Sequence, residues 1–437
     1  MSAPATAFAL RGAFGPRWVW VVAALGLLHA LPFLCRPVLL GGDEPHYALM
    51  ARSIAVDHDL DLDADYARIH AGSRAAGARF AGRELAPHVT ERAGRSTFTH
   101  GLGLPLLAAP GIYLLSRIVP LAAPDLLLIL GTLVVTFSAL LVGIGLLGRL
   151  LGDPRAGAVV ALVVYFGTPL WFYSRTFFAD PYLWAFAVLA VGGLVTGRPA
   201  RAGLLLGLAL FCKETAVPLV LAIGTLACSR LGLRRTRPAL VAFGACAVAW
   251  LLRGAWLFGD PLATTNPFVL GSWRGILGVL FDPRHGLLPF APVLLLALLP
   301  EPTPVAPAER ATRRGASVFA LSILLLTAAW IDWGGGTCYG PRLLLPAIAA
   351  LAVPLAFVWR RWQARAVVRW TILVAGAAGF VLGLLAAWDP FRAAWSPSVL
   401  ELVAARPLAT AGALGVAAAA MLRLERFARA GGESQAT

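Results

Sequence analysis

The residues most suited to chemistry lie at the edges of long apolar stretches. The first group is Asp43 and Glu44, followed by Pro45, His46 and Tyr47, directly after the opening apolar stretch. A carboxylate in this place can act as a general base or as a metal ligand. An acidic residue before a proline is also a common helix start, in which the carboxylate caps backbone N–H groups. Both interpretations stay open, and the spacing of Asp43 and His46 permits a divalent metal.

A run of alternating aspartates follows this group: Asp57, Asp59, Asp61, Asp63 and Asp65. An EF-hand calcium loop with this spacing requires glycine at its sixth position and glutamate at its twelfth. Those positions hold Leu62 and Arg68, which excludes an EF-hand. We therefore interpret the run as a solvated acidic rim and not as a cation site.

A short segment with small residues, 97–105, leads into the next apolar stretch. Gly101 and Gly103 allow a ligand or another backbone to approach closely. His100 precedes them and is either a phosphate contact or an ordinary residue of the membrane interface.

Two further pairs of charged residues interrupt apolar stretches. Arg175 and Asp180 lie in the polar segment 173–181 and either pair with each other or take part in function. Lys213, the only lysine of the chain, stands beside Glu214 in the middle of an apolar stretch. Charges there are costly unless they face a polar cavity. The alternative is a short loop between two helices, with the lysine reaching to water.

The last candidate group surrounds a Gly-rich turn at 332–342, which contains Tyr339 and Arg342. An arginine beside exposed backbone N–H groups is suited to binding phosphate. The turn is not a P-loop, because no Gly-Lys-Ser/Thr follows. A plain helical hairpin is the alternative. Arg284 and His285 form a similar polar re-entry point that we expect on the same face.

The composition identifies the elements that must position these residues. The chain has 437 residues, of which 59% are hydrophobic and 14% charged, and a mean hydropathy of +0.76. Soluble domains are about 25% charged, so a soluble globular protein is excluded. The net charge of +15 comes from arginines in short runs between apolar stretches, which is typical of cytoplasmic loops and not of a nucleic-acid-binding surface. The five cysteines show no pairing pattern, and we interpret them as small apolar residues.

These features predict an all-α polytopic membrane protein with about 11–13 transmembrane helices and one long outer loop after the first span. The apolar stretches after this loop lie at 101–123, 125–148, 156–173, 180–197, 202–229, 238–258, 286–300, 315–332, 341–359, 369–388 and 407–422. The predicted parts are a cytoplasmic N-terminus (1–17), a first transmembrane helix (18–40), an outer, periplasmic acidic loop with interfacial helices (41–100), a transmembrane core (101–360), C-terminal transmembrane helices (361–423) and a cytoplasmic tail (424–437).

Three details of this topology can be tested. The stretch Ala48–Ala55, begun by Pro45, is expected to be an amphipathic interfacial helix. The stretch 202–229 is expected to break near Lys213 into two short helices. Since arginine-rich loops favour the cytoplasm, 101–123 and 125–148 cannot both be full spans, and the prolines of 101–123 make it the partial element. This topology places the candidate residues on the outer side, with the segment 97–105 left unassigned.

Taken in order, the motifs resemble bacterial members of the GT-C glycosyltransferase superfamily, the relatives of protein O-mannosyltransferases and lipid A aminoarabinose transferases. The resemblance covers roughly residues 18–360 and rests on Asp43-Glu44 with Tyr47, the segment 100–105, the segment 173–181, Lys213-Glu214, the segment 282–288 and the turn 339–342. It implies the GT-C fold with the active site facing outward.

The resemblance also implies roles for individual residues. Asp43 would be the general base, Asp180 would position it or the acceptor, and Lys213 and Arg342 would bind the lipid phosphate. The full candidate set is catalytic Asp43, Glu44 and Asp180, and substrate-binding His46, Tyr47, His100, Arg175, Lys213, Glu214, Arg284, His285, Tyr339 and Arg342. The sequence departs from the family in two places: many relatives have Glu at the position of Asp180, and His100-Gly101-Leu102-Gly103 replaces the Lys/His-Pro-Pro segment of the aminoarabinose transferases.

The predicted activity is transfer of a hexosyl or pentosyl group from a polyprenyl-phosphate sugar. The acceptor would be a glycan, lipid or protein at the outer face of the cytoplasmic (inner) membrane, and a single displacement predicts inversion. No cofactor is required, although a divalent metal is possible. The alternatives are a transporter or lipid flippase, which broken helices and buried charges also fit, and a non-enzymatic assembly factor. We see no internal repeat, which speaks against a transporter.

Overall fold

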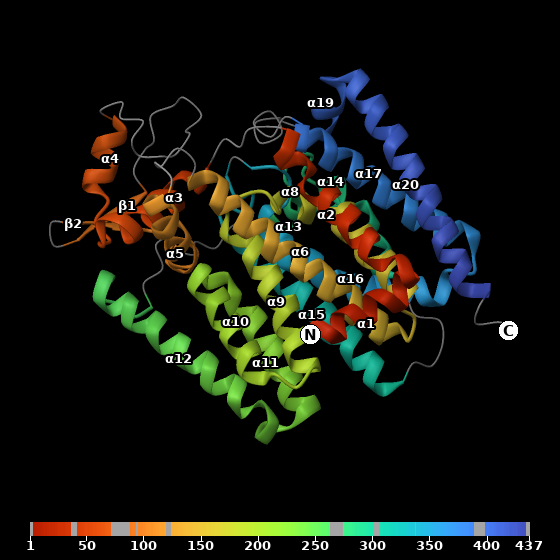
Figure 1. Ribbon diagram of the computed structural model, residues 1–437, viewed down its shortest axis with the longest axis horizontal. Helices are drawn as coiled ribbons and strands as arrows, with labels where there is room; N and C mark the ends of the chain where they lie inside the picture. Colours follow the sequence, from red (N-terminus) through yellow and green to blue (C-terminus); the bar gives the residue numbers. More distant parts are fainter. Residues whose placement is uncertain are drawn as a thin grey trace. The chain divides into compact units, whose positions relative to one another are not determined.

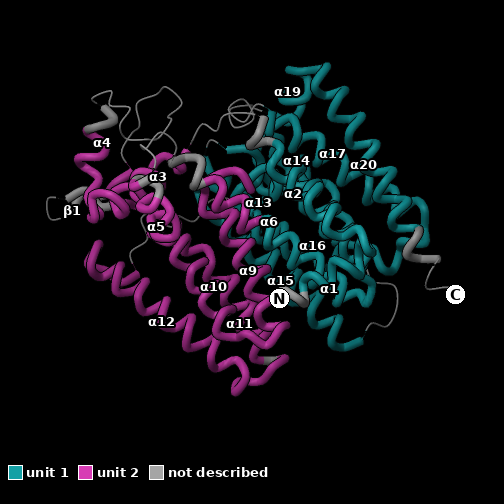
Figure 2. The backbone as a smooth tube through the Cα atoms, viewed as in Figure 1, with its two compact units in different colours: residues 1–35, 137–173, 269–437 teal, residues 36–136, 174–268 magenta. Residues whose placement is uncertain are grey.

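The computed structural model describes nine segments of the chain: 3–35, 42–70, 88–92, 95–118, 124–262, 274–299, 306–336, 338–388 and 398–433. The chain divides into two compact units, each discontinuous in sequence (Figure 2). Unit 1 comprises residues 1–35, 137–173 and 269–437, and unit 2 comprises residues 36–136 and 174–268.

Unit 1 consists of helices and 3-10 turns. Its elements are α1 (Ala3–Phe14), a turn at Gly15–Arg17, α2 (Trp18–Cys35), the second part of α6 (Pro124–Leu151), α7 (Pro154–Phe166), α8 (Pro169–Tyr173), α13 (Arg274–Phe281), α14 (Leu287–Phe290), a 3-10 helix at Pro292–Leu298, α15 (Pro307–Ala329), a turn at Arg342–Leu344, α16 (Leu345–Trp362), α17 (Ala366–Trp388), α19 (Val399–Ala404) and α20 (Pro407–Glu433).

Helix α7 forms the core of unit 1. Asp153 caps its N-terminus by accepting hydrogen bonds from the Arg155 and Ala156 N–H groups at 2.9 and 3.1 Å, and Pro154 fits the first turn because that position needs no N–H donor. Every residue from Ala156 to Phe166 is buried. The helix packs against α1, α16, α17 and α20.

Unit 2 contains the shorter elements of the long polar segment and a group of apolar helices (Figure 1). Its elements are α3 (Glu44–Arg52), a π-helical turn at Ser53–Asp57, α4 (Asp63–His70), β1 (Val89–Arg92), β2 (Arg95–Phe98), α5 (Gly103–Ile118), the first part of α6, α9 (Ala179–Val195), α10 (Pro199–Cys212), a 3-10 turn at Glu214–Ala216, α11 (Val217–Leu231) and α12 (Leu233–Phe258). Helix α10 packs against both α9 and α12.

The strands β1 and β2 add a small antiparallel hairpin to the otherwise helical fold that was predicted. Val89 pairs with Phe98 and Arg92 with Arg95. The hairpin lies within the predicted outer loop, where sequence alone gave no strand signal.

Within the described segments, six stretches are long and apolar enough to cross a membrane: Thr6–Leu31, Ile129–Leu151, Leu233–Phe258, Arg342–Trp362, Ala366–Trp388 and Pro407–Arg429. In the same segments, five shorter apolar helices of 10–17 residues correspond to α5, α7, α9, α10 and α11 in whole or in part. Large apolar side chains on these helices are exposed, including Trp20 at 77% and Trp256 at 72%. Such exposure is costly in water and is expected for helices that face lipid. The total of 11–13 crossings stays a prediction.

Several element boundaries differ from the predicted ones. Helix α2 begins at Trp18, as predicted for the first transmembrane helix, although it ends at Cys35 and the candidate span Thr6–Leu31 also includes part of α1. The stretch 286–300 is not one helix but α14 followed by a 3-10 helix, because it carries prolines at 289 and 292. Helix α20 continues to Glu433, so most of the predicted tail is helical.

Other local predictions are settled within unit 2. The break in 202–229 is confirmed, since α10 ends at Cys212 and α11 begins at Val217. A helix does begin here, with Pro45 in its first turn, but it runs only from Glu44 to Arg52 and all nine of its residues are buried. The prediction of a surface-lying amphipathic helix at Ala48–Ala55 is therefore wrong.

Candidate active site

The start of α3 places Asp43 at the rim of unit 2. The Asp43 carbonyl accepts the N–H groups of His46 and Tyr47 at 3.1 and 3.2 Å, which begins the helix. In the described segment 42–70, the Asp43 side chain makes no capping hydrogen bond to α3. Its Oδ1 lies instead 3.9 Å from Nδ1 of His88, with 26% of the side chain exposed. The interpretation of Asp43 as a helix cap is therefore wrong.

The β1–β2 hairpin brings two histidines beside Asp43. The carbonyl of His88 accepts both the N–H and the hydroxyl of Thr99, at 3.2 and 3.0 Å. This pairing extends the hairpin to its base and leaves His100 next to His88. Nδ1 of His88 and Nε2 of His100 lie 2.9 Å apart.

His46 and Tyr66 both contact His88, and they also contact each other. The rings of His46 and His88 stack with centroids 3.7 Å apart and an interplanar angle of 13°. The Tyr66 hydroxyl lies 2.5 Å from Nδ1 of His46 and accepts the His88 N–H at 3.2 Å. Burial lowers the pKa of His46 to about 3 and also lowers the pKa of His88. Both rings are therefore neutral at pH 7.

One group of possible metal ligands stands out among the described residues. The ligand atoms of Asp43, His88 and His100 all lie within 4.8 Å of one another. The sequence suggested Asp43 and His46 as the ligand pair, but His46 is not in this group, and its Nδ1 contacts the Tyr66 hydroxyl instead.

Glu44 anchors the loop before α9. Its Oε1 accepts the Phe177 N–H at 2.6 Å, and the carboxylate is buried. Arg175, in the same loop, is also buried; burial lowers the pKa of its guanidinium to about 10, and the negative charge of Glu44 opposes this shift. The Arg175 guanidinium is thus charged at neutral pH, and Glu44 fixes the backbone of this loop through the Phe177 N–H.

Asp180 and Lys213 form a partly buried ion pair. The Lys213 ammonium donates to Oδ1 of Asp180 at 2.8 Å, and the two side chains are 20% and 4% exposed. Lys213 has an extended backbone, with φ −164° and ψ 137°, and this conformation ends α10. The lysine therefore faces a carboxylate instead of reaching to water.

The close approach of two backbones brings the His100 segment to Lys213. A Cβ atom at Gly101 would lie 2.6 Å from the Phe211 carbonyl oxygen, and one at Gly103 would lie 2.6 Å from the Cys212 nitrogen. Such distances are too short for any residue with a side chain. Because Gly101 and Gly103 have no side chains, the backbone at the end of α10 can pack directly against this segment.

Arg253 is a candidate that the sequence analysis missed. It lies on α12, is 8% exposed, and donates from Nη2 to the His100 carbonyl at 2.9 Å. Glu214 and Tyr47 are close enough to interact with it electrostatically, and the Tyr47 ring lies 5.3 Å from that of His100. An arginine inside an otherwise apolar stretch is a sequence signal for function, and 238–258 contains this one.

The aspartate run is not simply a solvated rim. Arg52 donates to Asp57 at 2.9 Å and to the buried Asp65 at 2.8 Å. Asp59 accepts the Ser53 hydroxyl at 2.7 Å. These bonds hold the segment 57–65 against the end of α3, so the prediction of a solvated rim is wrong for Asp57 and Asp65.

The remaining candidates lie in unit 1. Oδ1 of Asp282 accepts the N–H groups of Arg284 and His285, both at 2.8 Å, and burial lowers the pKa of His285. The Tyr339 carbonyl accepts the Tyr173 hydroxyl at 2.6 Å. Arg342 is buried at the start of a 3-10 turn. The structure thus groups Asp43, His100, Lys213 and their neighbours in unit 2, and Arg284, His285, Tyr339 and Arg342 in unit 1.

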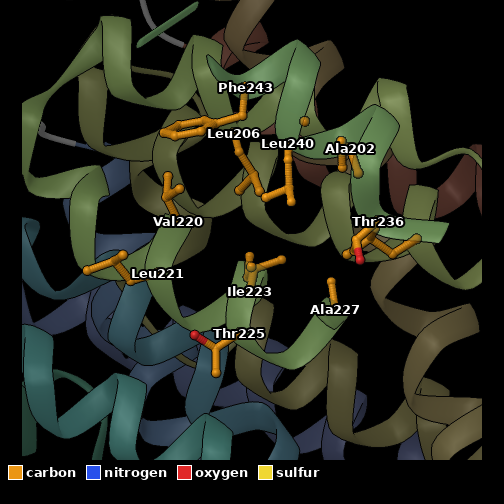
Figure 3. A pocket seen from close by; sticks show the side chains of 14 residues that line it. Ala202, Leu206, Val220, Leu221, Ile223, Thr225, Ala227, Thr236, Leu240 and Phe243 are labelled. Carbon is orange, nitrogen blue, oxygen red and sulfur yellow. The ribbon is translucent and has the colours of Figure 1, made fainter. Parts of the chain in front are cut away.

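An apolar crevice of about 240 Å³ opens among the helices of unit 2 (Figure 3). Leu206 of α10, Val220 of α11, and Leu240 and Phe243 of α12 line it. Leu206 precedes Lys213 by seven residues, which corresponds to about 10 Å along a helix.

Comparison with known proteins identifies the fold. No protein-family model and no curated protein sequence matches this chain. The structure is similar to the crystal structure of ArnT from Cupriavidus metallidurans bound to undecaprenyl phosphate, with a TM-score of 0.52 and 17% identity over 95% of this chain and 76% of that chain. This chain has the GT-C fold.

The GT-C fold expected from the sequence is thereby confirmed, as is the polytopic helical architecture. A weaker similarity, with a TM-score of 0.41 and 14% identity, joins 96% of this chain to 56% of the apo oligosaccharyltransferase of Archaeoglobus fulgidus. At these identities the likeness concerns the fold, and the roles of individual residues stay predictions.

Proposed function

We propose that the protein is a glycosyltransferase that moves a sugar from a polyprenyl-phosphate donor to an acceptor at the outer face of the cytoplasmic membrane. The observation that carries this proposal is the grouping within unit 2 of one partly exposed carboxylate, Asp43, with the cations Lys213 and Arg253. The GT-C fold supports it by analogy.

The proposed reaction is a single displacement. Asp43 takes the proton of an acceptor hydroxyl, and the oxygen attacks the anomeric carbon of the sugar. The bond between this carbon and the phosphate oxygen breaks, and the lipid phosphate leaves with the electron pair. Lys213 and Arg253 stabilise its charge. Attack opposite the leaving group inverts the anomeric configuration.

The surrounding residues position these groups. Asp180 holds the Lys213 ammonium in place, and Glu44 fixes the loop before α9. In this scheme Glu44 is a positioning residue and not a proton carrier. His100 connects the two sides of this group, since it lies near Asp43 and its carbonyl accepts from Arg253, and the Tyr47 ring lies beside it.

The apolar crevice suits the lipid part of such a donor. Its lining offers apolar side chains from four helices, α9 to α12, and it begins about 10 Å along α10 from Lys213. A phosphate at Lys213 would thus leave its polyprenyl chain free to follow α10 into the crevice. ArnT, in the structure named above, is bound to undecaprenyl phosphate.

The test uses the full-length protein in lipid nanodiscs with a panel of polyprenyl-phosphate sugars. Release of polyprenyl phosphate in the presence of acceptor-containing envelope extract is expected for the wild-type protein. Asp43→Asn should lower this release by about 100-fold or more, because general-base catalysis contributes about 10²–10⁴. Asp63→Asn, a change at an exposed aspartate of the same segment, is the matched control and should retain activity.

The transporter alternative predicts another outcome. A flippase would move a labelled polyprenyl-phosphate sugar across the bilayer of proteoliposomes and leave the sugar–phosphate bond intact. Translocation without cleavage for every donor would overturn the proposed function, and full activity of Asp43→Asn would remove Asp43 as the base.

A further inference from the structure

We propose that Asp43, His88 and His100 bind one divalent transition-metal ion of the Zn²⁺ class. This inference goes beyond the proposed sugar transfer and does not depend on it. It rests on the arrangement of three side chains from two separate segments of unit 2, the start of α3 and the base of the β1–β2 hairpin.

The distances fit a single ion. Zn²⁺ binds histidine nitrogen at about 2.0–2.1 Å and carboxylate oxygen at about 2.0–2.2 Å, so a tetrahedral site separates its ligand atoms by about 3.3 Å. Here Nδ1 of His88 lies 2.9 Å from Nε2 of His100 and 3.9 Å from Oδ1 of Asp43. Shifts of less than 1 Å would bring each of these two separations to the tetrahedral value.

The chemistry of the donors selects the class of metal. Two imidazoles and one carboxylate are a common ligand set of zinc and of neighbouring transition metals. Ca²⁺ and Mg²⁺ prefer sites made of oxygen atoms alone. Three protein ligands leave a fourth position for water or for an oxygen of a bound molecule.

The surrounding contacts hold the ring of His88 and the main chain of both histidines in place. His46 stacks flat on His88, and the Tyr66 hydroxyl binds both the His88 N–H and the His46 ring. Arg253 holds the His100 carbonyl. Because these contacts already restrain both histidines, less ordering is required when an ion binds.

A metal at this point would tie the hairpin to the start of α3. It would also place a positive charge against the Asp43 carboxylate, and its open position would face whatever molecule approaches that carboxylate. If the proposed transfer is correct, the ion would hold an acceptor hydroxyl or a donor phosphate oxygen there.

The first experiment measures metal binding without reference to activity. The full-length protein is purified without a histidine tag, stripped with a chelator, and titrated with Zn²⁺ in detergent while metal content and thermal unfolding are recorded. We expect one equivalent of tightly bound Zn²⁺ and a rise in unfolding temperature. His88→Ala and His100→Ala should each weaken binding by more than about 100-fold, beyond the effect of losing a group that merely orients a ligand.

His58→Asn is the matched control. His58 lies in the same polar segment, is exposed, and has a left-handed backbone with φ 60°, which asparagine tolerates. It should bind Zn²⁺ like the wild-type protein. Should the alanine variants fail to fold, zinc-edge X-ray absorption of the wild-type protein decides the point, with scattering from two imidazoles at about 2.0 Å expected.

Absence of stoichiometric Zn²⁺ binding, or equal binding by His88→Ala and the wild-type protein, would overturn the metal site. The two proposals fail separately. Chelator-resistant sugar transfer without bound metal would leave the proposed function standing, whereas tight metal binding with no turnover of any donor would leave the metal site standing.

Discussion

At the residue scale, the carboxylates of unit 2 differ in burial and in bonding partners, and these differences, not the residue type, determine which of them a substrate can reach. Glu44 is buried and bonded to the Phe177 N–H, and Asp180 is buried against Lys213. Asp43 is adjacent to Glu44 in sequence, yet it keeps 26% of its side chain exposed. A general base must reach a substrate hydroxyl, and Asp43 has this access.

The ion pair of Lys213 and Asp180 gives a test at the same scale. Lys213→Met would leave the buried Asp180 carboxylate without its cation, which we expect to cost about 3 kcal/mol of stability, the lower end for a buried pair because Lys213 is partly exposed. Thermal and denaturant unfolding in detergent measure this loss. Lys213→Met/Asp180→Asn should recover much of the stability, because it removes both charges, but should not recover sugar transfer.

Arg201→Met is the control for that prediction, since Arg201 is an exposed cation on α10, the helix that ends just before Lys213. It should change stability by less than about 0.5 kcal/mol. Equal stability of Lys213→Met and Arg201→Met would show that the ion pair does not hold Lys213 in the folded protein.

At the element scale, the start of α5 and the end of α10 depend on each other. Gly101→Ala would place a Cβ atom 2.6 Å from the Phe211 carbonyl oxygen and closer still to that of Cys212. Backbone atoms cannot yield as a flexible side chain can, so we expect a loss of at least about 1–3 kcal/mol and displacement of His100 from Arg253. Unfolding measurements and the zinc titration report these two effects independently.

Gly244→Ala provides the comparison, because a Cβ atom at Gly244, within α12, meets nothing within 4 Å. Alanine favours helix over glycine by about 1 kcal/mol, so this variant should be as stable as the wild-type protein or slightly more stable. If Gly101→Ala behaved in the same way, the packing of the two segments would have to differ from that described.

Some secondary-structure elements could be predicted from the local sequence, and others could not. The break at Lys213 was predictable, because a charged pair cannot continue an apolar helix at low cost. The hairpin was not, because its stability comes from pairing between Val89–Arg92 and Arg95–Phe98 in a polar segment without alternating apolar residues. The 3-10 helix after α14 replaces a predicted span, because prolines interrupt its backbone bonding.

At the scale of the whole molecule, the arginine distribution predicts the topology. Ala64 lies in the polar segment that we expect outside, and Ala364 lies between α16 and α17 in an arginine-rich loop that we expect inside. Both positions are exposed. In a background without the native cysteines, Ala64→Cys should react with an impermeant thiol reagent in intact spheroplasts, and Ala364→Cys should react only after the membrane is opened.

Labelling of both cysteines from one side would contradict this topology. It would also remove the outward-facing active site from the proposed function, while the ligand geometry within unit 2 would be unaffected. The orientation and the chemistry are therefore tested by separate measurements.

The sequence by itself determined the class of protein, the GT-C resemblance and the position of the carboxylate that follows the first apolar stretch. These properties depend on composition and on residues close together in the chain. The length of apolar stretches, the placement of arginines and the geometry of single helices are all local features that can be read from such residues. The partners of that carboxylate were decided only by the tertiary structure. His88 and His100 flank a hairpin, and Arg253, which bonds to the His100 carbonyl, lies on a distant helix. Contacts between segments far apart in sequence leave no periodic signal in either one.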